Sequence, residues 1–278
     1  MRLRWILLGL CVLALGALAL MYAEATRTPI VRQAAFAMPD WPLGAPPLRV
    51  ALLSDIHVAG PDMPTERVAK IVERVNRLRP DLVLIAGDFT SDKQPATRLY
   101  SGPEAIAPLA TLKAPLGTIA VLGNHDHWRG LAEIEQGLAA AHVRLLRNQA
   151  IAVGPLSLGG VDDAFTGSDD VPATVAAMRS HRGARVVLSH SPDVVPGTPS
   201  DVTLILAGHT HCGQIRLPLI GAISYQSKYG ERFACGLSRD GPKRVVTSGG
   251  LGTSVLPLRL GAPPEIWLLT LRGAPGKR

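Results

Sequence analysis

The chain has 278 residues, of which 47% are hydrophobic, and it carries a formal net charge of +7 at pH 7. This apolar content is ample for a folded core in one large or two small domains, and it excludes disorder on a large scale. The positive charge fits an anionic membrane surface or a phosphorylated substrate. Nucleic acid is not expected as a partner, because the basic residues are scattered and aromatic residues make up only 4% of the chain.

The first 25 residues predict a membrane segment. An uncharged run from Trp5 to Tyr22 follows Arg2 and Arg4, and its length is close to what a bilayer-spanning helix needs. The run is longer than the apolar core of most signal peptides, which favours an uncleaved anchor. Ala23-Glu24-Ala25 offers a small-residue cleavage site, so a secreted chain that loses this segment is the alternative.

Charges on the two flanks of this run predict its orientation. Arg2 and Arg4 favour an N-terminus in the cytoplasm, which places the rest of the chain on the periplasmic side of the inner membrane. Arg27 and Arg32 on the other flank argue in the opposite sense, so a cytoplasm-facing domain stays open.

Residues 26–47 are interpreted as a proline-rich linker, because four prolines lie between Ala34 and Pro47 with little periodicity. This linker would lift the folded domain away from the membrane. The domain itself is then expected over residues 48–278.

The domain opens with a predicted βαβ unit. A short apolar strand is expected over residues 48–53, and a helix with its N-cap at Thr65 follows with apolar residues at helical spacing. Pro80 stops this helix, and residues 81–86 form a continuous apolar strand of the kind that is buried on both faces.

Further elements follow in chain order, and together they indicate an α/β fold. Gly154-Pro155 closes a predicted hairpin. Helices are expected over 104–112, 128–140 and 173–180, and strands over 118–122, 150–153, 156–161, 184–189, 202–207, 243–248 and 265–271.

Polar side chains follow many of these strands at the point where each strand ends, which is where open α/β folds place their ligand sites. Two aspartates, one asparagine and four histidines form this set: Asp55, His57, Asp88, Asn124, His190, His209 and His211. Such oxygen and nitrogen ligands suit Mn, Fe, Zn or Co, and they are too many for one tetrahedral ion. Two metals sharing one carboxylate would lie about 3.5–4 Å apart, an arrangement used in phosphoryl-transfer hydrolysis.

Histidines elsewhere are interpreted differently. His125 also follows a predicted strand, so five of the eight histidines lie at strand ends. His142 and His181 lie between elements and are interpreted as structural, because an isolated histidine is more often a core or surface residue than a ligand. The role of His127 stays undecided.

Five motifs occur in order along the chain: Asp55-Ile56-His57, Gly87-Asp88, Gly123-Asn124-His125-Asp126, Ser189-His190 and Gly208-His209-Thr210-His211. Together they resemble the motifs of the calcineurin-like metallophosphoesterases, over roughly residues 48–271. The resemblance implies a single α/β domain in which a β-sandwich is flanked by helices, in α/β/β/α layers.

The resemblance also implies the role of each site residue. One metal ion would be held by Asp55, His57 and His211, and the other by Asn124, His190 and His209, while Asp88 would bridge both. His125 would face the leaving group, supported by Asp126.

Two further stretches resemble a bacterial membrane-anchored phosphodiesterase subgroup, some of whose relatives are similar to UDP-2,3-diacylglucosamine pyrophosphatases. These stretches are residues 213–218 and 249–254, with 263–266 close behind the second. The resemblance implies a hydrolase that uses two divalent ions and cleaves phosphodiester or pyrophosphate bonds by metal-activated water. Mn is the expected metal, and Fe, Zn and Co are the alternatives. A membrane-associated or lipid-linked substrate is expected, of the UDP-diacylglucosamine or phospholipid type. The alternatives are a nucleotide phosphodiesterase or broad phosphomonoesterase, and a non-catalytic metal-binding scaffold.

Three cysteines do not form a disulfide framework. Cys11 lies in the apolar segment, which leaves Cys212 and Cys235 as a pair if the domain faces an oxidising compartment. Two unpaired side chains are the favoured interpretation. Cys212 stands where the subgroup commonly has glycine, and it directly follows His211.

Overall fold

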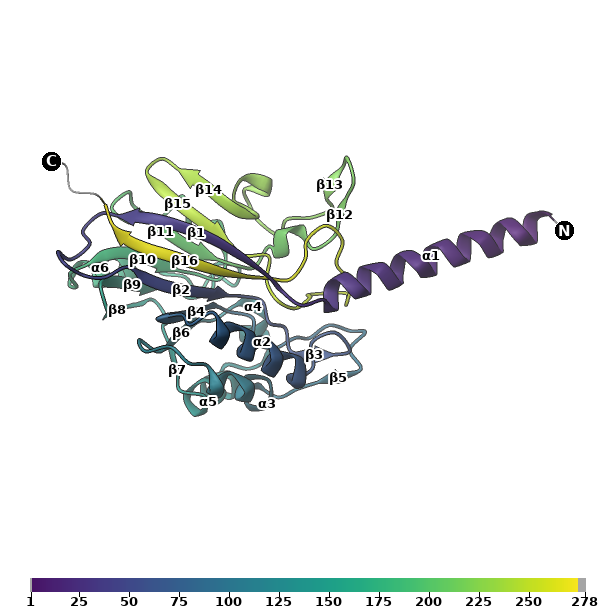
Figure 1. The fold of residues 1–278 in the computed structure, drawn as a ribbon, viewed down its shortest axis with the longest axis horizontal. Coiled ribbons are helices and arrows are strands. Elements are labelled where there is room, and N and C mark those ends of the chain that lie inside the picture. Colours follow the sequence, from purple (N-terminus) through teal and green to yellow (C-terminus); the bar gives the residue numbers. More distant parts are fainter. Residues whose placement is uncertain (1, 275–278) are drawn as a thin grey trace.

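The computed structural model describes residues 2–274, which form two six-stranded sheets packed face to face (Figure 1). The first sheet has the order β1-β16-β2-β4-β6-β7, with strands Ile30–Met38, Glu265–Gly273, Leu48–Leu53, Leu82–Ala86, Thr118–Val121 and Val143–Leu145. The second has the order β14-β15-β11-β10-β9-β8, with strands Gly236–Asp240, Lys243–Thr247, Leu204–Ala207, Ala184–Leu188, Leu156–Gly160 and Gln149–Val153. The predicted β-sandwich is confirmed.

The core between the sheets is built from alternate side chains of the strands. Val50 and Leu84 of the first sheet pack in the same buried cluster as Leu158 and Leu206 of the second. Full burial of one such side chain stabilises the fold by about 1.5–3 kcal/mol. This core therefore fixes the two sheets against each other and, with them, the strand ends that carry the polar residues.

Helices cover the outer faces of both sheets (Figure 1). The first sheet is covered by α2 (Thr65–Arg77), α3 (Gly102–Ile106) and α5 (Leu131–Ala140), and the second by α6 (Val171–Arg179). In α2, Val68, Ile71, Val72 and Val75 are buried against the sheet, as their helical spacing predicts. The predicted α/β/β/α layering is confirmed.

Some predicted helices have different ends in the structure. The helix expected over 128–140 is two helices, α4 (Asn124–Arg129) and α5, because Gly130 between them has φ 109°. The segment 104–112 contains the end of α3 and the 3₁₀ helix η1 (Ala107–Thr111), which begins at a proline-containing turn. Thr65 is the first residue of α2 and not its N-cap, since Pro64 holds the cap position.

The linker prediction for residues 26–47 is wrong over residues 30–38. This segment is β1, which pairs in parallel with β16 from Ile30 opposite Glu265 to Met38 opposite Gly273. Phe36 and Met38 are buried in the core between the sheets. The four prolines that suggested a linker all lie after the strand, where they cost it no ladder hydrogen bond.

Shorter elements lie in the connections between the strands. β3 (Ala59–Gly60) pairs antiparallel with β5 (Arg98–Leu99), and β12 (Arg216–Leu217) forms a small hairpin with β13 (Gly221–Ala222). Three further 3₁₀ turns are η2 (Pro192–Val194), η3 (His211–Gly213) and η4 (Gly230–Phe233).

The N-terminal helix α1 (Arg2–Thr26) projects from the sandwich (Figure 1), and it is long and apolar enough to cross a membrane. Its side chains are exposed from Arg2 to Leu20. Hydrogen bonds hold its last turns against the domain, among them those that the Arg259 amide donates to the Met21 carbonyl at 3.0 Å and the Gly261 amide donates to Glu24 Oε2 at 3.2 Å. The domain end of α1 is therefore fixed, and the rest of the helix is free of the domain.

Candidate active site and metal centre

The ends of β2, β4, β6, β10 and β11 meet at one edge of the sandwich. Backbone hydrogen bonds connect the loops that follow them, including Asp55 N to Gly87 O at 3.0 Å and Gly208 N to His190 O at 2.8 Å. The structure thereby brings together all seven residues that the sequence singled out as ligands, and each is buried. We call this group the floor of the site.

Five floor residues adopt left-handed backbone conformations that are uncommon for non-glycine residues. Their φ angles lie between 48° and 70°: Asp55, His57, Asp88, His209 and His211. Such conformations cost free energy, and they persist where the surrounding structure imposes them, often at functional sites. Neighbouring glycines make room for them, since a Cβ on Gly208 would come within 2.5 Å of Asp55 Oδ2.

The first ligand group consists of Asp55, His57 and His211. The Nε2 atoms of His57 and His211 lie 3.0 Å apart, and His211 Nε2 lies 3.5 Å from Asp55 Oδ1. Burial lowers the pKa of both histidines well below the usual value, so both rings are neutral at neutral pH and carry a free lone pair. Two neutral imidazoles and a carboxylate that converge in this way suit a divalent metal ion.

The second group consists of Asn124, His190 and His209. His190 Nε2 lies 3.1 Å from both Asn124 Oδ1 and His209 Nδ1. The other ring nitrogen of His190 lies 2.7 Å from the Ala86 carbonyl, which orients the ring as a backbone acceptor orients a metal-ligating histidine. Burial lowers the pKa of His209 to about 3, and its buried Nε2 has no hydrogen-bond partner among the described residues.

Asp88 lies between the two groups. Its Oδ2 is 3.3 Å from His57 Nε2 on one side and 3.3 Å from His190 Nε2 on the other. Burial alone would raise the pKa of Asp88, but His190 and His57 outweigh burial and hold it well below its usual range. The carboxylate is therefore ionised and placed where one oxygen can serve both groups.

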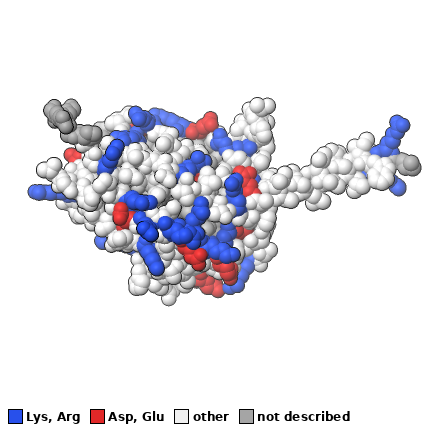
Figure 2. Space-filling view, in the orientation of Figure 1, with Lys and Arg blue, Asp and Glu red and all other residues white. Residues whose placement is uncertain are grey.

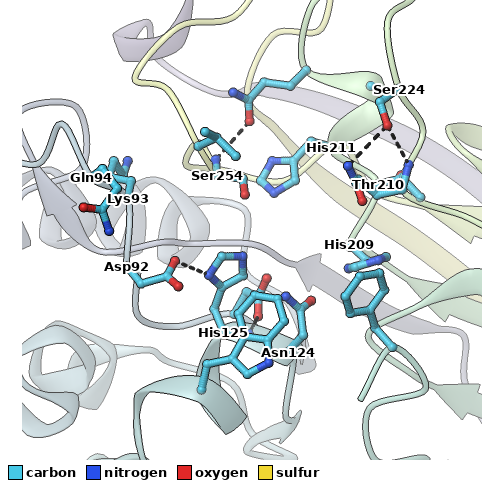
Figure 3. Close-up of a pocket in the computed structure, with 17 residues that line it drawn as sticks. Asp92, Lys93, Gln94, Asn124, His125, His209, Thr210, His211, Ser224 and Ser254 are labelled. Carbon is cyan, nitrogen blue, oxygen red and sulfur yellow. Dashed lines mark hydrogen bonds and ion pairs between the residues drawn. The ribbon is translucent and has the colours of Figure 1, made fainter. Parts of the chain in front are cut away.

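The ring of His125 contacts a residue that the sequence analysis did not single out. His125 Nδ1 lies 2.7 Å from Asp92 Oδ1, so Nε2 is the nitrogen left to face the floor (Figure 3). A ring nitrogen of His125 also lies within 4.8 Å of ligand atoms of His57 and Asp88. Asp92 follows no strand directly, and no spacing in the sequence marks it.

Asp126 does not support the His125 ring as the resemblance implied. Its carboxylate accepts hydrogen bonds from the backbone amides of Asp88 at 2.8 Å, Phe89 at 2.9 Å and Gly123 at 3.0 Å. Burial, followed by repulsion from Asp88, raises its pKa to about 7. Asp126 therefore ties the loop after β4 to the start of α4, because its acceptors satisfy amides that would otherwise be buried without partners.

Two other polar contacts border the site. His127, whose role the sequence left undecided, lies with Nε2 2.8 Å from Asp162 Oδ1, which makes it part of a loop contact. Lys93 donates to both carboxylate oxygens of Asp62, at 2.8 and 3.0 Å, and to Thr253 Oγ1 at 2.8 Å. This buried network anchors the loop that carries Asp92.

A cavity of about 440 Å³ opens above the floor (Figure 3). Trp128 and Phe165 form an aromatic wall, with ring centroids 6.1 Å apart. The opposite wall consists of neutral amides and hydroxyls: Gln214, Ser224, Gln226 and Ser254. We call these six residues the rim. Among the described residues that line the cavity, Lys93 is the cation of fixed charge, and Asp62 neutralises it.

The interpretation of Cys212 and Cys235 as unpaired is wrong, because the structure joins them in a disulfide. The Thr210 hydroxyl donates to the Ala234 carbonyl at 2.6 Å, which brings the two cysteines together although 23 residues separate them. The disulfide thus connects the floor, at the neighbour of His211, to the segment that follows η4.

The chain is similar to known proteins. A family model described as calcineurin-like phosphoesterase matches residues 48–213. The chain is 32% identical over 239 residues to the uncharacterized metallophosphoesterase YkuE of Bacillus subtilis (strain 168), covering 83% of this chain and 81% of that protein. It is 31% identical over 237 residues to the phosphodiesterase YaeI of Escherichia coli (strain K12), covering 82% and 83%.

A third relative is a transmembrane protein with metallophosphoesterase domain from Danio rerio, 30% identical over 247 residues. The alignment covers 82% of this chain and 54% of that protein, so the chain matches about half of its length. The chain therefore belongs to the calcineurin-like phosphoesterases and is a metal-dependent phosphoester hydrolase.

Proposed function

We propose that the chain is a dinuclear phosphoesterase which cleaves phosphodiester or pyrophosphate bonds of a membrane-associated substrate. Asp55, His57 and His211 hold one divalent ion, and Asn124, His190 and His209 hold the other. The observation that carries this proposal is the position of Asp88, 3.3 Å from a histidine of each group. A single buried carboxylate in that place suits a shared ligand.

Different residues of the chain have different roles in the reaction. When bound, a pair of divalent ions neutralises phosphate charge and lowers the pKa of water. His125 faces the leaving oxygen through Nε2 and donates a proton there, because Asp92 holds its other nitrogen. The Asp92 carboxylate holds the ring in the orientation that this step needs, as the acidic partner of a catalytic histidine does.

Membrane association is proposed through α1, by its length and its exposed apolar surface. Mn is the metal we would test first. The disulfide supports an extracytoplasmic position for the domain, because disulfides persist in oxidising compartments. A lipid-linked phosphodiester or pyrophosphate fits this location and the neutral rim.

A nucleotide phosphodiesterase is the second candidate, favoured by the aromatic wall. Trp128 and Phe165 are 55% and 48% exposed, and exposed rings can stack on a nucleobase. A non-catalytic scaffold has less support, since all seven expected ligands are present and converge.

The experiment is a substrate panel on the full chain in detergent with Mn²⁺ added. The panel contains a phospholipid, a lipid pyrophosphate, a nucleotide diester and a nitrophenyl diester. The proposal expects turnover of a lipid-linked compound above that of the nucleotide diester. Turnover of the nucleotide diester alone would favour the second candidate, and absence of turnover with two ions bound would contradict both enzyme proposals.

A further inference from the structure

Two loops beside the cavity expose large apolar side chains to solvent. In the β12–β13 hairpin and the residue after it, Leu219, Ile220 and Ile223 are 108%, 77% and 69% exposed, and in the neighbouring loop Val255 is 71% exposed. We call residues 217–223 and 255–256 the apolar loop pair. Contiguous exposed apolar surface of this kind marks a binding face, because water solvates it poorly.

The two loops are joined at their bases. Gln214 at the foot of the hairpin donates to the Leu256 carbonyl at 3.1 Å and accepts from the Ser254 amide at 2.9 Å. Arg216 N donates to Leu260 O at 2.8 Å, which extends the contact along the second loop. The apolar loop pair is therefore one surface and not two separate loop tips.

This surface lies beside the domain end of α1. The second loop continues directly into Arg259 and Gly261, whose amides bond to Met21 and Glu24 in the last turns of the helix. The part of α1 beyond these contacts, residues 2–20, has a length of about 28 Å at 1.5 Å per residue. That length matches the roughly 30 Å hydrocarbon core of a bilayer, so a membrane crossed by α1 would end at the level of the apolar loop pair.

Charge around the end of α1 indicates what covers the surface. A groove of about 520 Å³ borders the same end of the helix and is lined by Arg27, Lys70, Arg74 and Arg77, with two glutamates among them. Figure 2 shows Lys and Arg gathered over α2, whereas the tip of the β12–β13 hairpin and most of α1 show no charged side chains. Basic groups beside an apolar surface fit the anionic headgroups and acyl chains of a bilayer.

The same segments also form the polar wall of the cavity. Gln214, Ser224, Ser254 and Val255 line it, so the rim and the apolar loop pair share their backbone. We propose that the apolar loop pair is a second membrane contact which enters the lipid boundary beside α1 and presents the mouth of the cavity to phosphate groups at the bilayer surface. This inference rests on the proposed membrane anchoring, and it specifies a lipid in the membrane as the substrate's source.

Fluorescence quenching of the full chain in anionic vesicles tests the contact. The label is bimane on Leu219→Cys in a Cys11→Ala background, and the quencher is a phospholipid brominated in its acyl chains. Leu43→Cys is the matched control, because Leu43 is 106% exposed in the loop after β1, at the end of that strand opposite to α1. Bimane on native Cys11, exposed in the middle of α1, reports insertion of the anchor itself.

The inference expects several-fold stronger quenching at position 219 than at position 43, together with strong quenching at Cys11. Quenching at Cys11 with none at position 219 would overturn the second contact and leave the anchor standing. Protection of position 219 from aqueous iodide without lipid quenching would also overturn it, because a protein surface would then cover the loops. No quenching at Cys11 would remove the anchor and this inference together. Since hydrolysis is not measured, failure of the phosphoesterase proposal would not alter these results.

Discussion

The floor and the rim of the site differ in how they are built. Every floor residue is buried and lies at or just after a strand end, and the backbone and side-chain contacts around it leave little freedom. The rim comes from α4 and from loops, and it exposes Trp128 and Phe165. The sandwich therefore fixes the catalytic residues of the floor. Substrate choice depends on the rim, which the sandwich constrains less.

The largest effect should come from His125, which lies where the floor meets the cavity. His125→Ala should lower the hydrolysis of an alkyl phosphodiester by about 10²–10⁴, the usual value of a positioned general acid. A nitrophenyl ester should lose much less, because its leaving group needs little protonation. The general-acid role is tested by measuring the turnover of both substrates by the variant, after its metal content has been confirmed. Equal losses on the two would contradict the general-acid role and favour His125 as a ligand or a packing residue.

A smaller effect should follow from Asp92, which acts through His125. Asp92→Ala removes the acceptor for Nδ1 and should lower alkyl diester turnover by about 10–100-fold, as loss of a partner that orients an active-site histidine does. Asp92→Asn keeps an oxygen acceptor and should lose less. The ratio of alkyl to nitrophenyl turnover is the readout, since a merely structural role would lower both alike. A wild-type ratio in Asp92→Ala would show that Asp92 does not position His125.

The smallest effect should come from the rim. Trp128→Ala should raise KM by about 2–10-fold with kcat nearly unchanged, because an aromatic contact contributes about 0.5–1.5 kcal/mol beyond its buried area. KM and kcat are measured in the steady state with the substrate that the panel selects. A large loss of kcat would place Trp128 with the floor and remove the distinction between the two regions.

The floor could be predicted from the sequence because its residues follow apolar runs directly. A strand end fixes the position of the next two or three residues, so Asp55, Asp88 and His190 are found where the pattern places them. Asp92 could not be found this way, because the chain leaves β4 several residues earlier and only tertiary contacts return it to His125.

Two other features also depended on tertiary structure. β1 was missed because its prolines lie just outside the strand and its parallel partner, β16, is more than 200 residues away along the chain. The disulfide of Cys212 required the fold to return the segment after η4 to the floor, which no spacing of three cysteines reveals.

Metal analysis of the native chain and of Asp88→Asn tests the central claim, that one carboxylate joins two ligand groups. The account predicts two divalent ions per native chain, and fewer than two with severely reduced turnover in Asp88→Asn. Asp169→Asn, at an exposed aspartate outside the site, should retain both ions. Two bound ions and near-native turnover in Asp88→Asn, or a native chain that binds a single ion, would contradict it.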